Sequence, residues 1–182
     1  MRVITGTARG RRLKELSGME TRPTTDRVKE GLFNIIQFDI EGRRVLDLFG
    51  GTGQLGIECL SRGADRAVFV DQRKDAAALI RDNLRTTELA DRGQVVQGDS
   101  LAYLSSCREK FHLIFLDPPY ASELLEQALK TIVRFDILSG NGIIVCETPA
   151  DRVLPEVPAP YRKGRDYRYG MIKLTLYRRD VD

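Results

Sequence analysis

The turn Asp117-Pro118-Pro119-Tyr120, which follows the apolar run 113–116, carries the most specific chemical pattern in the sequence. Pro119 restricts the residue before it to an extended backbone, and each proline fixes its own φ angle. The Pro118 carbonyl is therefore held in one direction beside the Asp117 carboxylate, and these two acceptors can face a single –NH2 group. Tyr120 is placed to stack on a base drawn out of its helix.

This arrangement suits methylation of a planar exocyclic amine. The lone pair of such a nitrogen is delocalised into the ring, so the nitrogen is a poor nucleophile. Acceptors on both N–H bonds favour a pyramidal nitrogen and bind the developing positive charge more strongly than the ground state. Asp117 can also receive the proton that is lost after transfer. None of the cysteines (Cys59, Cys107, Cys146) is placed as the nucleophile that carbon methylation of pyrimidines needs.

A second pattern is the glycine-rich turn between the apolar run 45–48 and a helix-like segment that begins at 53. Glycines let the backbone take positive φ values and let a ligand approach closely, and the first N–H groups of the helix point at the turn. Residues 51–56 read G-x-G-x-x-G, and Asp71 lies 20 residues after Gly51, as in a dinucleotide fingerprint. The pattern by itself admits a nicotinamide dinucleotide.

Electrostatics separates the candidate cofactors. A pyrophosphate at the helix N-terminus would lie close to Asp47, and two anions repel each other. S-adenosylmethionine carries a sulfonium and an ammonium and has no phosphate, so it is favoured by that carboxylate. Asp71 can accept both ribose hydroxyls, and Asp99 can accept the adenine amine. We therefore expect S-adenosylmethionine to be held by Asp47, Phe49, Gly51, Thr52, Gly53, Asp71, Gln72, Asp99 and Ser100.

The elements that position these turns alternate along the chain. Apolar runs predict strands at 45–48, 67–71, 94–97, 113–116 and 142–146, and helical periodicity predicts helices at 53–62, 74–84, 101–104 and 124–133. Apolar strands alternating with helices indicate an α/β fold with a mostly parallel, doubly wound sheet covered on both faces. Residues 162–169 and 171–178 predict a C-terminal antiparallel hairpin. This is the Rossmann-like architecture of S-adenosylmethionine-dependent methyltransferases.

Two segments precede this core. Val28, Leu32, Ile35 and Ile36 share a helical face that we expect to pack on the sheet, with Thr24 or Thr25 as the cap. Before it, the runs 2–5 and 13–16 flank a glycine-bearing loop and predict an N-terminal hairpin. The hairpin carries four cations that could contact RNA phosphates, although a solvated basic loop explains them equally well: Arg9, Arg11, Arg12 and Lys14.

Composition limits the remaining possibilities. The 182 residues suit a single domain, 1–182, with a basic extension at 1–18 and the Rossmann-like core at 43–182. The formal net charge of +3 is modest, but cations gather at the two ends and favour an anionic partner. No apolar run is long enough for a bilayer, and the cysteines lack paired spacing. We expect a cytoplasmic monomer without metal, disulfides or membrane partner.

Three segments together resemble the RsmD family, bacterial methyltransferases that modify guanine N2 in small-subunit (16S) ribosomal RNA. The segments are 22–34, with its Arg-Pro-Thr and Leu-Phe-Asn motifs, then 45–56 and 117–120. The similarity covers nearly the whole chain. It implies that Arg22, Pro23 and Thr24 help close the cofactor pocket, that 117–120 hold the guanine, and that the target is read in an assembled 30S subunit. His112 departs from the acid that relatives often carry there, and we expect it to be peripheral.

Other functions share parts of this pattern. The same turn serves DNA adenine-N6 and cytosine-N4 methyltransferases, but those enzymes usually carry an extra recognition domain. Glutamine methyltransferases more often have Asn in place of Asp117. A non-catalytic RNA-binding assembly factor with this fold is disfavoured by the intact Asp47 and Asp117, and a dehydrogenase remains the outside alternative.

Overall fold

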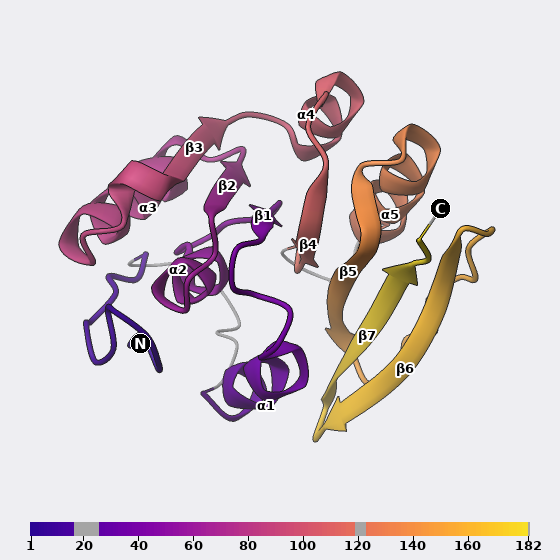
Figure 1. Ribbon diagram of the computed structural model, residues 1–182, viewed down its shortest axis with the longest axis horizontal. Helices are drawn as coiled ribbons and strands as arrows, with labels where there is room; N and C mark the ends of the chain where they lie inside the picture. The colour runs from indigo at the N-terminus through magenta and orange to yellow at the C-terminus, as the bar shows by residue number, and fades with distance from the viewer. Residues whose placement is uncertain (17–25, 119–122, 182) are drawn as a thin grey trace.

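One seven-stranded sheet forms the centre of the protein (Figure 1). The computed structural model describes residues 1–16, 26–118 and 123–181. The strands are β1 Arg44–Asp47, β2 Arg66–Asp71, β3 Gly93–Gln97, β4 Phe111–Leu116, β5 Leu138–Pro149, β6 Tyr161–Tyr169 and β7 Ile172–Arg179. Their order across the sheet is β3-β2-β1-β4-β5-β7-β6. The first five are mutually parallel, and β7 pairs antiparallel with β5 and β6, which confirms the predicted sheet and its C-terminal hairpin.

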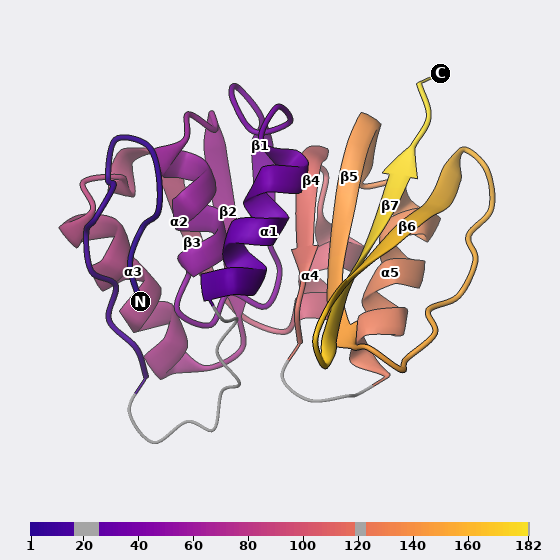
Figure 2. The same ribbon diagram turned by 90° about the horizontal axis from the view of Figure 1, so that it is seen from below.

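Helices cover both faces of the sheet (Figure 2). The helices are α1 Asp26–Ile36, α2 Gln54–Ser61, α3 Lys74–Thr86, α4 Ser100–Ser106 and α5 Leu124–Phe135, with a 3-10 turn at Ala90–Arg92. The first three pack in one apolar cluster with one face of the sheet, and α4 and α5 pack in a second cluster with the other face. This split explains the continuously apolar strands, since alternate residues of β2 such as Val68 and Phe69 enter opposite clusters.

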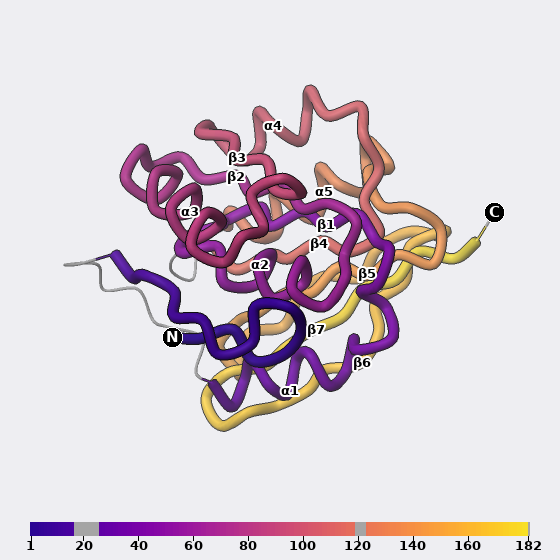
Figure 3. Tube along the Cα trace, turned by 60° about the vertical axis from the view of Figure 1, so that its left-hand side comes forward, coloured from indigo at the N-terminus to yellow at the C-terminus, as the bar shows by residue number. Residues whose placement is uncertain are grey.

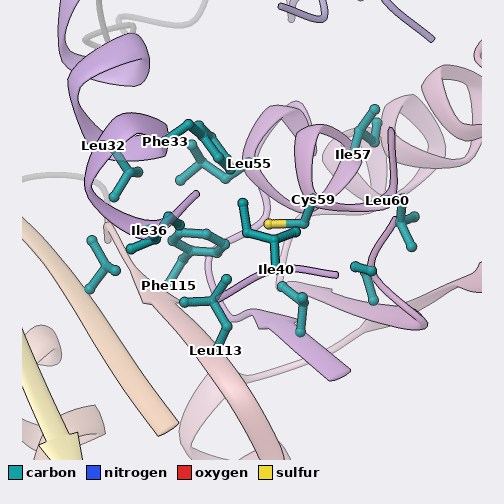
Figure 4. Close-up of a cluster of buried hydrophobic side chains, with 14 of the residues drawn as sticks. Leu32, Phe33, Ile36, Ile40, Leu55, Ile57, Cys59, Leu60, Leu113 and Phe115 are labelled. Carbon is teal, nitrogen blue, oxygen red and sulfur yellow. The ribbon is translucent and has the colours of Figure 1, made fainter. Parts of the chain in front are cut away.

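The cluster beneath α1 and α2 is closely packed (Figure 4). Phe33 of α1 and Phe115 of β4 have ring centroids 6.3 Å apart in a tilted arrangement. Cys59 lies fully buried among these side chains, and Cys146 is fully buried in β5. The structure thus confirms that both thiols are packing residues. Burial raises the pKa of each thiol, which keeps it protonated and unreactive.

Gly56 brings α2 close to β2. A Cβ atom at this position would lie 2.3 Å from the Phe69 ring, so only glycine allows the observed approach. This is the last glycine of the G-x-G-x-x-G pattern, whose role in such a fold is close helix–strand packing. It therefore fixes the start of α2 relative to the strand ends.

The N-terminal hairpin is present but shorter than predicted. Only Arg2 and Arg12 form a bridge, and the expected strands 2–5 and 13–16 are otherwise absent from the described residues. The reason is a competing acceptor, because the N–H groups of Ile4 and Thr5 donate to Glu58 of α2 at 2.8 and 3.0 Å. The segment consequently lies along the α1–α2–α3 side of the molecule (Figure 3).

The predicted element boundaries differ most at β5. The apolar run 142–146 marks only its centre, whereas the strand extends from Leu138 to Pro149. Pairing with β7 continues the strand, since Glu147 pairs with Leu174 and Pro149 with Ile172. The extension brings Glu147 and Thr148 into the sheet. At the other end of the chain, Thr24 and Thr25, the predicted caps of α1, lie outside the described residues.

Candidate active site

Acidic residues end the central strands on one face of the sheet. Asp47 is aligned with Phe69 in β2 and with Phe115 in β4, two residues before Asp71 and Asp117. Successive side chains of a strand alternate between faces, so these three carboxylates project toward the α1–α2–α3 side. The prediction that they share the carboxyl edge therefore holds, and this edge is where open α/β sheets bind ligands.

The glycine-rich turn is fixed by backbone hydrogen bonds. Gly50 N–H donates to the Val70 carbonyl at 2.9 Å, and Gly53 N–H donates to the Gly50 carbonyl at 2.7 Å. Gly51 and Gly53 have φ angles of 58° and 82°, which side-chain-bearing residues rarely adopt. The turn is therefore a rigid backbone surface that begins directly at the end of β1.

Asp47 occupies the N-terminal turn of α2. Its Oδ2 accepts the Gly56 N–H at 3.1 Å, and the residue is 3% exposed. Burial raises the pKa of Asp47 to about 7, the Gly56 hydrogen bond opposes this, and nearby Asp71 adds to it. Because this carboxylate already fills the positive end of the helix, a pyrophosphate there would be repelled. The donor set fits a cationic ligand such as S-adenosylmethionine.

Asp71 and Asp99 organise backbone as well as facing the edge. Asp71 accepts the Gly51 N–H at 3.0 Å through one oxygen and the Arg73 N–H at 2.9 Å through the other. Each carboxylate oxygen can accept a further hydrogen bond, so two hydroxyls of a ribose remain compatible with Asp71. Asp99 caps α4 by accepting the Ala102 N–H at 2.8 Å.

The other predicted cofactor residues lie in two environments. Phe49 and Thr52 are half-buried in the turn, and the Thr52 hydroxyl is 3.5 Å from the Met1 sulfur. Gln72 is exposed directly after β2, whereas Ser100 is buried at the start of α4. Arg22, Pro23 and Thr24 lie outside the described residues.

Asp117 and Pro118 follow β4 at this edge. Asp117 is half-buried and Pro118 is buried. Asp117 is part of the wall of a hollow between α1, α2 and the sheet, which is lined by Leu32, Leu55, Phe115, Leu116, Asp117, Val145, Glu147 and Leu174. The hollow thus joins the start of α2 to the catalytic turn. Tyr120 lies outside the described residues.

The basic N-terminal side chains lie on the surface. Arg9, Arg11, Arg12 and Lys14 are all exposed. Arg11 is partly occupied, since it donates to the Thr86 carbonyl at 3.0 Å and pairs with Glu88 at 3.4 Å. Lys14 is held through its backbone, which exchanges hydrogen bonds with the side-chain amide of Asn83.

Sequence reasoning missed two polar residues that position this region. The Asn83 amide, besides binding Lys14, donates to the Thr52 carbonyl at 2.9 Å and so links the basic segment to the glycine turn. Glu58 is fully buried and pairs with Lys29 at 3.3 Å and Arg62 at 2.9 Å. Each could have been found as a polar residue on the buried face of a helix, which is uncommon unless the group is paired.

His112 lies at the other end of β4 from the catalytic turn. Its Nδ1 accepts the Arg44 N–H at 3.0 Å, which ties the starts of β1 and β4 together. Partial burial lowers the pKa of His112, and neighbouring Arg44 and Arg43 lower it further, so the ring is kept neutral. The expectation of a peripheral histidine agrees with this placement.

Two simple exclusions complete the description. Among residues 1–16, 26–118 and 123–181, no helix is both long and apolar enough to span a bilayer. The same residues contain no group of three or more histidine, cysteine or acidic side chains arranged to hold a metal ion.

The sheet order, the glycine turn and the acidic strand ends define the class of the protein, an S-adenosylmethionine-dependent methyltransferase. A solved structure of yhhF from Escherichia coli superimposes with a TM-score of 0.87 at 31% identity, covering 100% of this chain and 99% of that one. The family model described as Conserved hypothetical protein 95 matches residues 1–178, and the chain belongs to this family.

Its relatives include proteins named ribosomal RNA small subunit methyltransferase D, which confirms the predicted RsmD family. The Haemophilus influenzae protein of that name is 35% identical over 97% of this chain and 93% of its own length. The Escherichia coli protein of that name is 33% identical over 100% of this chain and 91% of its own length. The YlbH protein of Bacillus subtilis is 41% identical, covering 98% of this chain and 99% of its own length.

Proposed function

We propose that the protein methylates the exocyclic N2 of a guanine in small-subunit ribosomal RNA. The observation that carries this proposal is the position of Asp117 and Pro118, which follow β4 beside the Asp47 turn, with Asp117 lining a hollow that reaches α2. The names of the relatives support small-subunit RNA as the substrate. The four-residue turn supports an exocyclic amine as the acceptor, and the resemblance supports guanine.

The residues of the chain divide the work between two halves of the edge. Bound S-adenosylmethionine supplies an electrophilic methyl group. Asp47 favours the cationic end of the donor, and Asp71 accepts its ribose hydroxyls. Asp117 and the Pro118 carbonyl accept the two N–H bonds of the target amine and hold its lone pair toward the donor. Asp117 then accepts the proton released when the nitrogen becomes positively charged.

The basic N-terminal segment is the proposed contact with RNA phosphates. Arg9, Arg12 and Lys14 present exposed cations, and the Asn83 hydrogen bonds place this segment beside the glycine turn. Phosphate contacts position a protein on RNA without selecting its sequence. We therefore assign orientation of the ribosomal RNA to this segment and selection of the base to the hollow beside Asp117. An assembled 30S subunit, as the resemblance implies, is the proposed physiological substrate.

The test is transfer of labelled methyl groups to undermethylated 30S subunits, naked ribosomal RNA and duplex DNA in parallel. Label in guanine N2 of subunit RNA is the expected result, and it should be lost in Asp117→Ala while S-adenosylmethionine affinity is retained. The matched control is Asp166→Ala, an aspartate on β6 outside the hollow, which should keep activity. Label in DNA with RNA inert, or an unimpaired Asp117→Ala variant, would contradict the proposal.

A further inference from the structure

Glu147 is an acidic residue of the catalytic edge that the proposed chemistry leaves unused. The β4–β5 register pairs Phe115 with Val145 and Leu116 with Cys146, so Glu147 lies across from Asp117 on the neighbouring strand. Phe115 and Val145 enter the cluster beneath α1, and side chains alternate, so both acids project to that same face. Both also line the hollow between α1, α2 and the sheet.

The surroundings of Glu147 are apolar. The residue is 8% exposed, and Leu32, Leu55 and Leu174 form much of the hollow that it lines. A carboxylate in such a wall strongly favours a ligand that offers it a hydrogen-bond donor. Adjacent strands lie about 4.8 Å apart, a spacing that lets two carboxylates reach neighbouring nitrogens of one planar ring. The hollow is therefore suited to a ring edge that carries two adjacent donors.

Among the amino-bearing bases, only guanine has such an edge. Its ring nitrogen N1 carries a hydrogen next to the exocyclic amine. In adenine the ring nitrogen beside the amine (N1), and in cytosine the corresponding N3, instead present a lone pair. That lone pair would face a carboxylate oxygen without a proton between them, which is unfavourable in a buried site. Two neighbouring carboxylates thus accept guanine and reject the other two bases.

We propose that Glu147 is a specificity-determining residue that accepts the N1–H of the target guanine, while Asp117 accepts its N2 amine. This inference rests on the proposed function and explains how the turn shared by many amino-methyltransferases is restricted to guanine. Glu147 is not required to take up a proton, since its role is to accept a hydrogen bond.

The test compares guanosine with 2-aminopurine riboside at the acceptor position. The analogue keeps the amine at C2, but its N1 carries a lone pair instead of a hydrogen. Mass spectrometry of digested, methylated subunits first locates the acceptor, and ligated RNA carrying the analogue there is then reconstituted into subunits. The wild type should prefer guanosine in kcat/KM by on the order of 100-fold, as expected where a buried acceptor loses its donor.

The informative variant is Glu147→Gln, whose amide can accept from guanosine or donate to the analogue. The preference should fall to roughly tenfold or less, because the Gln side chain can satisfy either N1. Glu156→Gln is the matched control on an exposed glutamate outside the hollow and should keep the wild-type preference. Melting temperature and S-adenosylmethionine affinity of Glu147→Gln should remain close to wild type, which verifies that the variant is folded.

The outcomes separate the two proposals. Guanosine methylation by the wild type with an unchanged preference in Glu147→Gln would overturn the role of Glu147 and leave the proposed function intact. A wild type that accepts both bases equally would overturn it as well. Absence of any methylation at guanine N2 in 30S subunits would instead contradict the proposed function itself.

Discussion

The carboxylate of Asp47 accepts a 3.1 Å hydrogen bond from the backbone N–H of Gly56. The acid at the end of β1 thereby serves the helix that follows it, although α2 has no side-chain cap at its own N-cap residue, Gly53. The contact places a buried negative charge where a dinucleotide-binding protein would hold a phosphate. One hydrogen bond therefore links the start of the helix with the choice of cofactor.

The raised pKa of Asp47 predicts how donor affinity depends on pH. The pKa is about 7 in the folded protein, against 3.8 for an ordinary aspartate, so the free protein holds a proton there at about pH 6. A cationic ligand favours the ionised form, hence S-adenosylmethionine should bind more tightly as the pH rises from about 5.5 to about 7.5. The gain should be on the order of tenfold. Calorimetry in buffers of different ionisation enthalpy measures both the affinity and the proton released.

Asp47→Asn is the matched variant, because its amide oxygen can still accept the Gly56 N–H. The raised pKa means that the Asp47 contribution to stability is fully present below about pH 4 and is lost as the pH rises to about 7. The melting temperature of the variant should therefore rise relative to wild type over that range, and its donor affinity should lose the pH-dependent gain. Parallel pH profiles for the two proteins would show that Asp47 is not the titrating group.

Gly56→Ala should destabilise the protein through the Phe69 ring. The added methyl group would lie 2.3 Å from a ring carbon, so α2 or Phe69 must move. Overpacking of this kind costs about 1–3 kcal/mol of unfolding free energy. Urea denaturation measures the loss, and Gly98→Ala is the control, since a Cβ there meets no atom within 4 Å. Equal stability of the two variants would mean that the packing adjusts freely.

Glu58→Ala should be strongly destabilising because it leaves two cations without their buried partner. Glu58 pairs with Lys29 and Arg62 and accepts the backbone N–H groups of Ile4 and Thr5. Breaking a buried ion pair from one side costs about 3–5 kcal/mol. The loss should appear in thermal unfolding, together with faster proteolysis of residues 1–16.

The control for that experiment is Glu88→Ala. Glu88 pairs with Arg11 at 3.4 Å, but its side chain is 78% exposed. Exposed ion pairs contribute at most about 1 kcal/mol, so this variant should unfold close to wild type. A small effect at both positions would contradict the assigned role of Glu58 in holding the N-terminal segment.

Removing charge from the basic segment tests its role in RNA binding. A triple variant of Arg9, Arg12 and Lys14 to Gln should bind small-subunit RNA more weakly, with a shallower salt dependence. The slope should fall by about 0.7–0.9 for each phosphate that the protein no longer neutralises. Filter binding over a salt series measures this, while S-adenosylmethionine affinity should stay unchanged.

The matched control replaces three exposed cations elsewhere, Arg108, Lys130 and Arg134, with Gln. Both triple variants lower the net charge equally, so a general charge effect would weaken binding in both. Weakening confined to the N-terminal variant supports a local phosphate contact. Identical RNA affinities for the two variants would reject the assignment.

The sequence by itself determined the order of strands and helices, the two chemical turns and the family. These features are local, because hydrophobic periodicity, glycine φ angles and proline restrictions act over a few residues. Asp47, Asp71 and Asp117 could be placed at one sheet edge since parallel strands of this fold present their carboxyl ends together.

Only the tertiary structure decided what lies next to what. Nothing near Ile4 in the chain indicates that its N–H donates to Glu58, 54 residues away, instead of completing a hairpin. Glu147 follows an apolar run just as Asp117 does, but its alignment with that residue depends on the β4–β5 register and on the extension of β5 by β7. Such pairings are set by long-range hydrogen bonds and by competition for buried polar groups, which local sequence does not encode.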